Sequence, residues 1–138
     1  MLPMQLHRGR LIDHLHLKVQ NLGASRRFYG AVLEAVGVPI VDGDGYFFAD
    51  ELWVDEGTSE QISHVHFAFQ ATDRAMVDRF YQAGLGAGGR DNGPPGLRDY
   101  HPGYYGAFLL DPDGNNIEAV FHGPAERSAP SVVVSWDD

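Results

Sequence analysis

The sequence contains no cysteine, which excludes disulfide bonds, thiolate nucleophiles and cysteine-rich zinc sites. Metal binding or acid–base chemistry therefore has to use histidine, aspartate and glutamate. Basic residues are also scarce, because the 138 residues include 10 Lys and Arg against 19 Asp and Glu, a formal net charge of -9. An acidic surface repels nucleic acid and anionic membranes, so we expect neither as a partner.

Long apolar runs are missing as well. No segment reaches the length of a membrane-spanning helix or shows the pattern of a signal peptide, so we expect a cytoplasmic protein. The chain is 43% hydrophobic and 21% charged, which is ordinary for a globular protein. Its length suits one compact domain and is too short for a large multidomain enzyme.

Two strand–helix units follow one another along the chain. Residues 11–19 alternate between apolar and polar side chains, which predicts a half-buried strand. Asn21 can then cap a helix that ends at Gly37. Residues 62–70 repeat the alternation, and a second helix follows behind Thr72 or Asp73.

The two units are related by a fixed offset. Phe28 recurs as Phe80, each followed by tyrosine, and His14 recurs as His66, in both cases 52 positions later. Any two amphipathic strand–helix units share apolar spacing, but the shared histidine, phenylalanine and tyrosine favour an internal duplication.

Short strands are predicted after each helix. Residues 46–48 and 52–54 are apolar runs bounded by glycines, and residues 104–110 and 116–121 flank the strong turn signal Asp-Pro-Asp-Gly-Asn. Residues 88–103 are rich in glycine and proline, so we expect a long loop there.

We predict an α+β fold with two modules in a single domain, residues 11–60 and 61–124. Residues 1–10 are expected to form an N-terminal arm. In the C-terminal tail, residues 125–138, the segment 131–135 would add an edge strand or contact a partner subunit.

Three potential metal ligands lie on the polar faces of the predicted strands. His14 and His66 occupy corresponding positions, and Glu118 points away from the apolar neighbours Ile117 and Ala119. Two imidazoles and one carboxylate on one surface form a facial site with open positions for substrate, a pattern that suggests catalysis. The alternative is that these are ordinary solvated side chains.

Three stretches, DHLHLKVQNLGASRRFY, HVHFAFQATDRAMVDRFY and FLLDPDGNNIEAV, resemble the vicinal oxygen chelate superfamily. This superfamily includes glyoxalase I, fosfomycin resistance proteins, extradiol dioxygenases and bleomycin resistance proteins. The resemblance covers residues 11–122. It implies paired βαβββ modules whose curved mixed sheets form a cup around a divalent iron, manganese, nickel, cobalt or zinc ion. His14, His66 and Glu118 would be its ligands.

The sequence departs from glyoxalase I at the fourth ligand position. Trp53 aligns with this position, and Glu51 and Asp55 are flanking substitutes of the same parity. A three-ligand site, which resembles those of fosfomycin resistance proteins and extradiol dioxygenases, is therefore expected. Trp53 is then a candidate for substrate binding.

Other polar residues are candidates for the same site. His16 and His64 share the faces of the predicted ligands, so they are competing metal ligands, pocket residues or exposed histidines. Lys18, the only lysine, would attract an anionic substrate or lie on the rim.

Residues 98–105 form a candidate lid, where His101 would act as general acid or base. Tyr104 or Tyr105 would hydrogen-bond a metal-bound oxygen, and Arg98 would contact substrate. The alternative is a loop that only packs against the sheet.

The resemblance implies a homodimeric, metal-dependent lyase or isomerase, transferase or dioxygenase that acts on a small oxygen-chelating substrate. The alternative is a metal-free small-molecule binding protein of the bleomycin-resistance kind.

Overall fold

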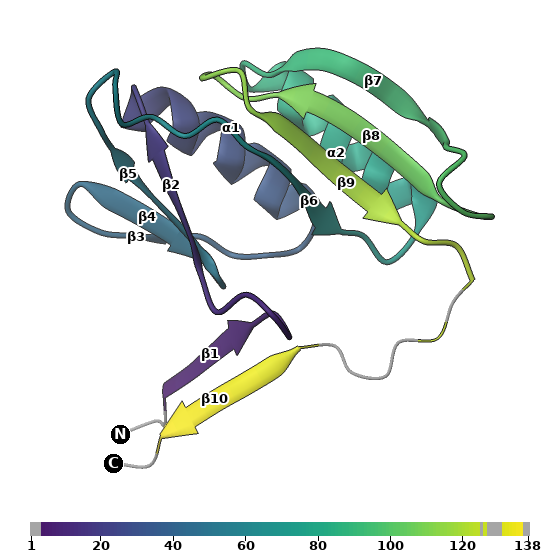
Figure 1. Ribbon diagram of the computed structural model, residues 1–138, viewed down its shortest axis with the longest axis horizontal. Coiled ribbons are helices and arrows are strands. Elements are labelled where there is room, and N and C mark those ends of the chain that lie inside the picture. Colours follow the sequence, from purple (N-terminus) through teal and green to yellow (C-terminus); the bar gives the residue numbers. More distant parts are fainter. Residues whose placement is uncertain (1–3, 125, 127–130, 137–138) are drawn as a thin grey trace.

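A computed structural model of the chain describes residues 4–124, 126 and 131–136. The element order repeats βαβββ twice, with one additional strand at each end (Figure 1). No helix among these residues is long and apolar enough to cross a membrane. In chain order the elements are β1 (Met4–Arg8), β2 (Leu15–Val19), α1 (Leu22–Ala35), β3 (Val41–Asp42), β4 (Tyr46–Ala49), β5 (Leu52–Glu56), β6 (His66–Gln70), α2 (Arg74–Gly86), β7 (Arg90–Leu97), β8 (Tyr105–Leu110), β9 (Asn116–Phe121) and β10 (Val132–Trp136).

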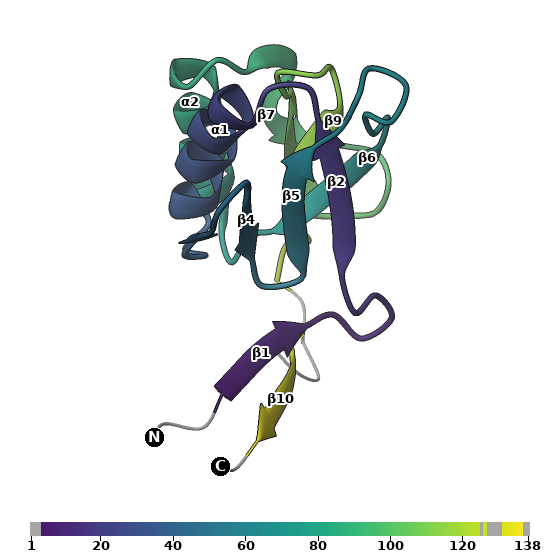
Figure 2. The same ribbon diagram turned by 90° about the vertical axis from the view of Figure 1, so that its left-hand side faces the viewer.

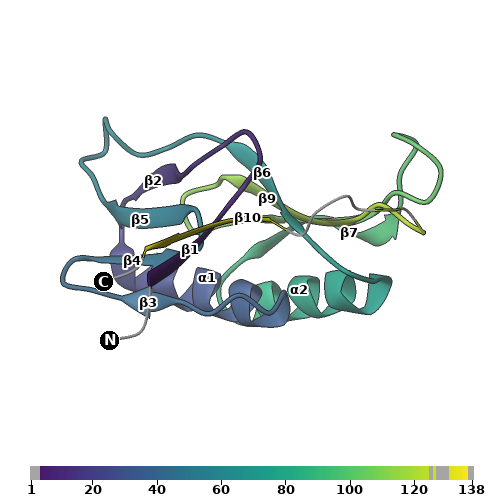
Figure 3. The same cartoon turned by 90° about the horizontal axis from the view of Figure 1, so that it is seen from below.

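Each module forms its own four-stranded mixed sheet, with strand orders β2-β5-β4-β3 and β6-β9-β8-β7. In both sheets the first strand of the module pairs in parallel with the last, and the remaining pairs are antiparallel. The two helices lie side by side in one layer beneath the strands (Figure 3). The predicted α+β fold of two βαβββ modules is therefore confirmed.

Both helices begin where the sequence predicts them. The Asn21 side chain accepts a hydrogen bond from the Ala24 backbone N–H at 2.9 Å, and Asp73 accepts one from Met76 at 2.7 Å. These side chains satisfy backbone donors that have no partner inside the helix. The two caps are separated by the same 52 positions as the predicted repeat.

The helices contact each other through a glycine of α2. A Cβ atom built on Gly84 would overlap Leu109 Cδ1 and lie 3.0 Å from Val32 Cγ1. Leu109 and Val32 are fully buried, so neither side chain can move into solvent. The absence of a side chain at Gly84 therefore allows α1, α2 and β8 to approach closely.

We expect Gly84→Ala to lower the free energy of unfolding by about 1–2 kcal/mol, because overpacking outweighs the higher helix propensity of alanine. Gly86→Ala is the matched control, since it lies in the same helix and a Cβ there meets nothing within 4 Å. This control should be neutral or stabilising by up to about 1 kcal/mol. Urea unfolding of both variants tests the prediction, and equal stabilities would contradict it.

The Asp-Pro-Asp-Gly-Asn turn connects β8 to β9 and is hydrogen-bonded to the first module. The buried Asp111 carboxylate accepts hydrogen bonds from the Tyr29 hydroxyl at 2.6 Å, from the backbone N–H groups of Asp113 and Asn115, and from Asn115 Nδ2. Tyr29 belongs to α1 of the first module, whereas Asp111 directly follows β8 of the second. This turn therefore has a structural role.

The first predicted strand is shorter than expected. Strand β2 begins at Leu15, and Leu11 and Ile12 are 85% and 52% exposed. Its parallel partner β5 begins at Leu52, which pairs with Leu15. Residues 11–14 therefore lie before the start of the β2–β5 ladder, although their sequence alternates. The second alternating segment is likewise shorter, since β6 begins at His66.

The long loop expected at residues 88–103 is wrong in part, because residues 90–97 form strand β7. This strand lies at the edge of its sheet and pairs with β8 with two register shifts. An edge position tolerates Pro94 and Pro95, since proline cannot donate to a central ladder.

The N-terminal arm and the C-terminal tail pair with each other. Strands β1 and β10 form an antiparallel two-stranded ribbon that extends away from the two modules (Figure 2). The expectation of an additional strand at residues 131–135 is met by β10, although its partner is β1. Residues 125, 127–130 and 137–138 of the predicted tail and residues 1–3 of the predicted arm lie outside the described residues.

Candidate functional site

Strand β9 carries a buried carboxylate on the side of its sheet that faces away from the core. Ile117 and Ala119 belong to the hydrophobic core, so Glu118 between them points to the opposite face. Its carboxylate is nevertheless only 3% exposed. His66 Nε2 lies 3.0 Å from Oε1, and the Tyr104 hydroxyl donates a hydrogen bond to Oε2.

Glycine at position 106 leaves space for this arrangement. A Cβ atom on Gly106 would lie 3.3 Å from Glu118 Oε2 and 3.2 Å from Tyr104 Cε1. Burial, and then the hydrogen bond to Glu118, raise the pKa of Tyr104 well above its usual value. The Tyr104 hydroxyl therefore stays neutral and donates to the carboxylate at physiological pH.

The third predicted ligand lies apart from this pair. His14 precedes β2, and its Nδ1 lies 2.8 Å from Asp13 Oδ1 at an exposed position. Within residues 4–124, 126 and 131–136, no three His, Asp or Glu side chains gather closely enough to hold a metal ion. One chain therefore presents His66 and Glu118 together, but not His14.

The first module has an aromatic side chain where the second has the carboxylate. His16 pairs with Trp53 across β2 and β5, just as Ala68 pairs with Glu118 across β6 and β9. Because His16 and Ala68 are 52 positions apart, Trp53 and Glu118 occupy equivalent places. The fourth ligand position therefore offers no donor atom for a metal.

The exposed face of the first sheet carries an aromatic cluster and a small ion cluster. The Trp53 ring stacks on Tyr46 and Phe48, with centroids 4.1 and 5.7 Å away. Asp55 Oδ1 lies 2.7 Å from His16 Nε2 and 3.1 Å from Lys18 Nζ. Burial raises the pKa of Asp55, but the hydrogen bonds from His16 and Lys18 outweigh this effect and lower it. The charges of these residues are therefore largely satisfied by one another.

The predicted lid residues separate into two groups. His101 lies beside Tyr104, but its Nε2 is 2.8 Å from Nδ1 of His122, a residue that sequence analysis did not single out. The position of His122 just after a predicted strand was the only sequence signal for it. Tyr105 points to the helix side of the sheet, where its hydroxyl donates to Asp78 of α2.

Arg98 and His64 also lie in different surroundings. The guanidinium of Arg98 lies over the Phe108 ring, on the same face as Glu118. His64 is exposed and precedes β6, close enough to Asp113 to lower the pKa of that carboxyl, although burial raises it overall. The structure thus brings Arg98, but not His64, toward the buried carboxylate.

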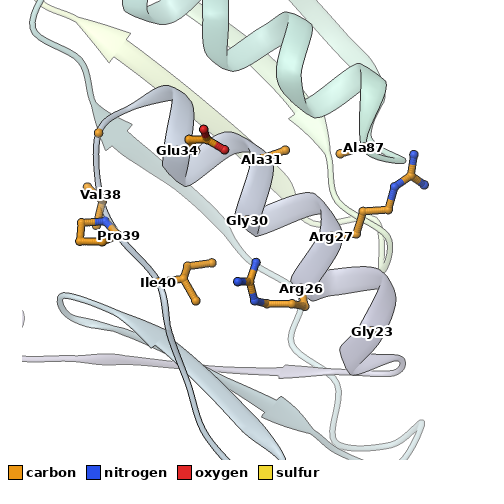
Figure 4. A pocket seen from close by; sticks show the side chains of 11 residues that line it. Gly23, Arg26, Arg27, Gly30, Ala31, Glu34, Val38, Pro39, Ile40 and Ala87 are labelled. Carbon is orange, nitrogen blue, oxygen red and sulfur yellow. The ribbon is translucent and has the colours of Figure 1, made fainter.

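A groove of about 840 Å³ lies elsewhere, along the surface of α1 (Figure 4). The two arginines that line it are already engaged, because Arg26 forms a two-pronged ion pair with Asp42 and Arg27 donates to the Gly86 carbonyl. None of the predicted site residues lines this groove. We therefore place the candidate site at Glu118.

The chain is similar to several solved structures. A glyoxalase/bleomycin resistance protein from Albidiferax ferrireducens is 30% identical, with a TM-score of 0.69 over 80% of this chain and 97% of that one. A glyoxalase-related enzyme from Fulvimarina pelagi is 21% identical, with a TM-score of 0.69 over 91% and 97%. A lactoylglutathione lyase from Agrobacterium tumefaciens is 20% identical, with a TM-score of 0.57 over 80% and 92%.

A search among curated proteins returned no match. Residues 11–119 match the family model of the Glyoxalase/Bleomycin resistance protein/Dioxygenase superfamily, which extends over both modules. This is also the relationship that the resemblance of the sequence implies. The chain therefore belongs to the glyoxalase/bleomycin resistance protein/dioxygenase superfamily.

Proposed function

We propose that this protein is a divalent-metal-dependent enzyme that acts on a small substrate with two neighbouring oxygen atoms. The observation that supports this most strongly is the buried carboxylate of Glu118 beside His66. A buried carboxylate is costly unless it is paired with a cation or bound to a metal. Its pairing with a half-exposed histidine leaves one side of the site accessible.

The spacing of the His66 and Glu118 side chains fits such an ion. Metal–ligand bonds of about 2.0–2.2 Å to imidazole nitrogen and carboxylate oxygen bring neighbouring ligand atoms to about 3 Å from each other. His66 Nε2 and Glu118 Oε1 are already 3.0 Å apart. The glycine at position 106 keeps a side chain away from the carboxylate oxygen. Nitrogen and oxygen ligands suit iron, manganese, nickel, cobalt or zinc.

We propose that the third ligand is His14 of a second copy of the chain in a homodimer. This proposal is supported by the exposure of His14 and by its separation from the His66–Glu118 pair within one chain. The open face of the first module in one copy would then cover the open face of the second module in the other. His16, Lys18 and Trp53 would contact the substrate from the walls of this enclosure.

The residues of the site have separate roles in this scheme. A divalent ion supplies electrostatic stabilisation for negative charge that develops on a substrate oxygen. The Tyr104 hydroxyl holds the Glu118 carboxylate in place through Oε2. His101 lies beside Tyr104 at the exposed end of the site, where it can exchange a proton with solvent or with His122.

Metal analysis by plasma mass spectrometry tests the proposal after reconstitution with each candidate ion. We expect wild-type protein to retain an ion that His66→Ala and Glu118→Ala lose, because either change leaves only two of three ligands. His64→Ala is the control and should retain the ion. Full metal retention by Glu118→Ala would overturn the proposal.

A mixture of His14→Ala and Glu118→Ala chains tests the shared site. Each heterodimer would contain one intact site, so random reassociation should restore about a quarter of the wild-type metal. Failure of this mixture to bind metal, while wild type binds it, would exclude ligands from two copies.

A second candidate function is metal-free binding of an aromatic molecule. The cluster of Trp53, Tyr46 and Phe48 on an exposed sheet face favours it, since aromatic ligands stack on such rings. Ligand binding that is unchanged by a chelator and lost in Trp53→Ala would select this function instead.

A further inference from the structure

Arg98 is held over the face of the second sheet that carries Glu118. Its backbone N–H donates to the Tyr104 carbonyl at 2.9 Å, which ties the start of the lid segment to its end. Its guanidinium carbon lies 5.4 Å from the centre of the Phe108 ring. Gly93 and Gly96 lie beneath it, and a Cβ on either would come within 3.4 Å of a guanidinium nitrogen. The absence of a side chain at these two glycines therefore leaves room for the Arg98 guanidinium.

The charge of Arg98 has no acidic partner within the described part of the chain. Ion pairs there engage Arg26 and Lys18, but none includes Arg98. Its hydrogen bonds go to two backbone carbonyls, those of Leu97 and Pro94. A guanidinium has five N–H donors, so most of these donors remain available to an additional acceptor.

Arg98 and the His66–Glu118 pair lie on the same face of the second sheet, next to Phe108. Phe108 pairs with Glu118 across β8 and β9, and its ring centre lies 5.9 Å from that of His66. The same ring lies under the Arg98 guanidinium. The Phe108 side chain is only 9% exposed and lies beneath Arg98 and beside His66, so a small molecule bound on this face would have a cation at one end and the His66–Glu118 pair at the other.

We propose that the substrate carries an oxyanion, a carboxylate or phosphoryl group, and that Arg98 binds it. The planar guanidinium matches the two oxygens of such a group with parallel hydrogen bonds. Because the protein as a whole is acidic, long-range attraction does not bring an anion to this site. Recognition depends on the local fork of Arg98. The expectation that the His66–Glu118 pair binds the other end of the substrate rests on the proposed function, whereas anion binding by Arg98 does not need the metal.

Binding of three probes in the presence of a chelator tests this inference. Benzoate presents a carboxylate on a small flat ring, benzamide has the same shape without the charge, and inorganic phosphate presents a phosphoryl oxyanion. Titrations followed by calorimetry or by amide chemical shifts give each affinity. We expect wild-type protein to bind at least one of the two anions, and to bind it more tightly than benzamide.

Arg98→Gln should weaken anion binding by about tenfold or more and leave benzamide binding unchanged. Arg79→Gln is the matched control, because it removes the same charge from an exposed position on α2. Arg98→Lys keeps the charge but loses the fork, so its affinity should be intermediate. The ratio of benzoate to phosphate affinity identifies which oxyanion the site prefers.

Three results would overturn the inference: binding of neither anion by wild type, equal anion affinity in Arg98→Gln and wild type, or an equal loss in Arg79→Gln. Thermal unfolding of each variant verifies that it is folded. Glu118→Ala separates this inference from the proposed function. It should lose metal but keep anion binding, so either proposal can fail while the other holds.

Discussion

Asp111→Ala is expected to lower the free energy of unfolding by about 3–5 kcal/mol, the largest loss of stability that we predict. The Asp111 carboxylate is 1% exposed and accepts four hydrogen bonds, one of them from Tyr29 of the other module. Removing the acceptor leaves buried donors with no partner and no access to water. Each such donor costs about 1–3 kcal/mol.

Urea unfolding followed by circular dichroism measures this loss. Asp44→Ala is the control, because Asp44 is exposed in a tight turn, and its stability should stay within about 0.5 kcal/mol of wild type. A loss below about 1 kcal/mol in Asp111→Ala would mean that the turn does not hold the modules together.

Tyr29→Phe should cost about 2 kcal/mol at neutral pH, since it removes a buried hydrogen bond to a carboxylate. The internal repeat provides a matched control in Tyr81→Phe. The Tyr81 hydroxyl also donates to a carboxylate, that of Asp91, but this contact is exposed. A cost below about 1 kcal/mol is therefore expected for the control. Equal costs would show that burial is not the cause.

The same variant changes the dependence of stability on pH. Burial, and then the charge and hydrogen bond of Asp111, raise the pKa of Tyr29 well above its usual value of about 10. The unfolded chain therefore releases this proton before the folded one does. The contribution of the protonated Tyr29 hydroxyl to stability is fully present below about pH 10. As pH rises further, the free energy of unfolding falls by about 1.4 kcal/mol per pH unit because of this group. The slope in Tyr29→Phe should be smaller by this amount.

The periodic parts of the fold follow from the sequence. The caps Asn21 and Asp73 precede strong helical patterns, and local hydrogen bonding alone is enough to position them. Strand limits depend instead on which neighbours are present. Alternation at residues 11–14 predicted a strand there, but the ladder of β2 with β5 begins only at Leu15, whereas the Gly- and Pro-rich segment 90–97 becomes a strand because it pairs with β8.

In the candidate site, too, some positions follow from the local sequence and others depend on tertiary contacts. Side-chain alternation along β9 placed Glu118 opposite the core residues, because a strand fixes the direction of each side chain. The contact between Tyr104 and Glu118 joins a loop to a strand, and its geometry depends on the path of the loop. The contact of His101 with His122 likewise depends on this path, which local sequence patterns do not determine.

The ribbon of β1 and β10 brings the two ends of the described chain together. Met4 pairs with Trp136 at its outer end, and antiparallel partners of this kind lie about 5 Å apart. A short linker from residue 136 to residue 4 would therefore close the chain into a ring. Opening that ring in the exposed turn at residues 58–61 gives a circular permutant in which the second module precedes the first, with the contacts between them preserved. The order of the modules along the chain is thus set by connectivity, and their packing does not require it.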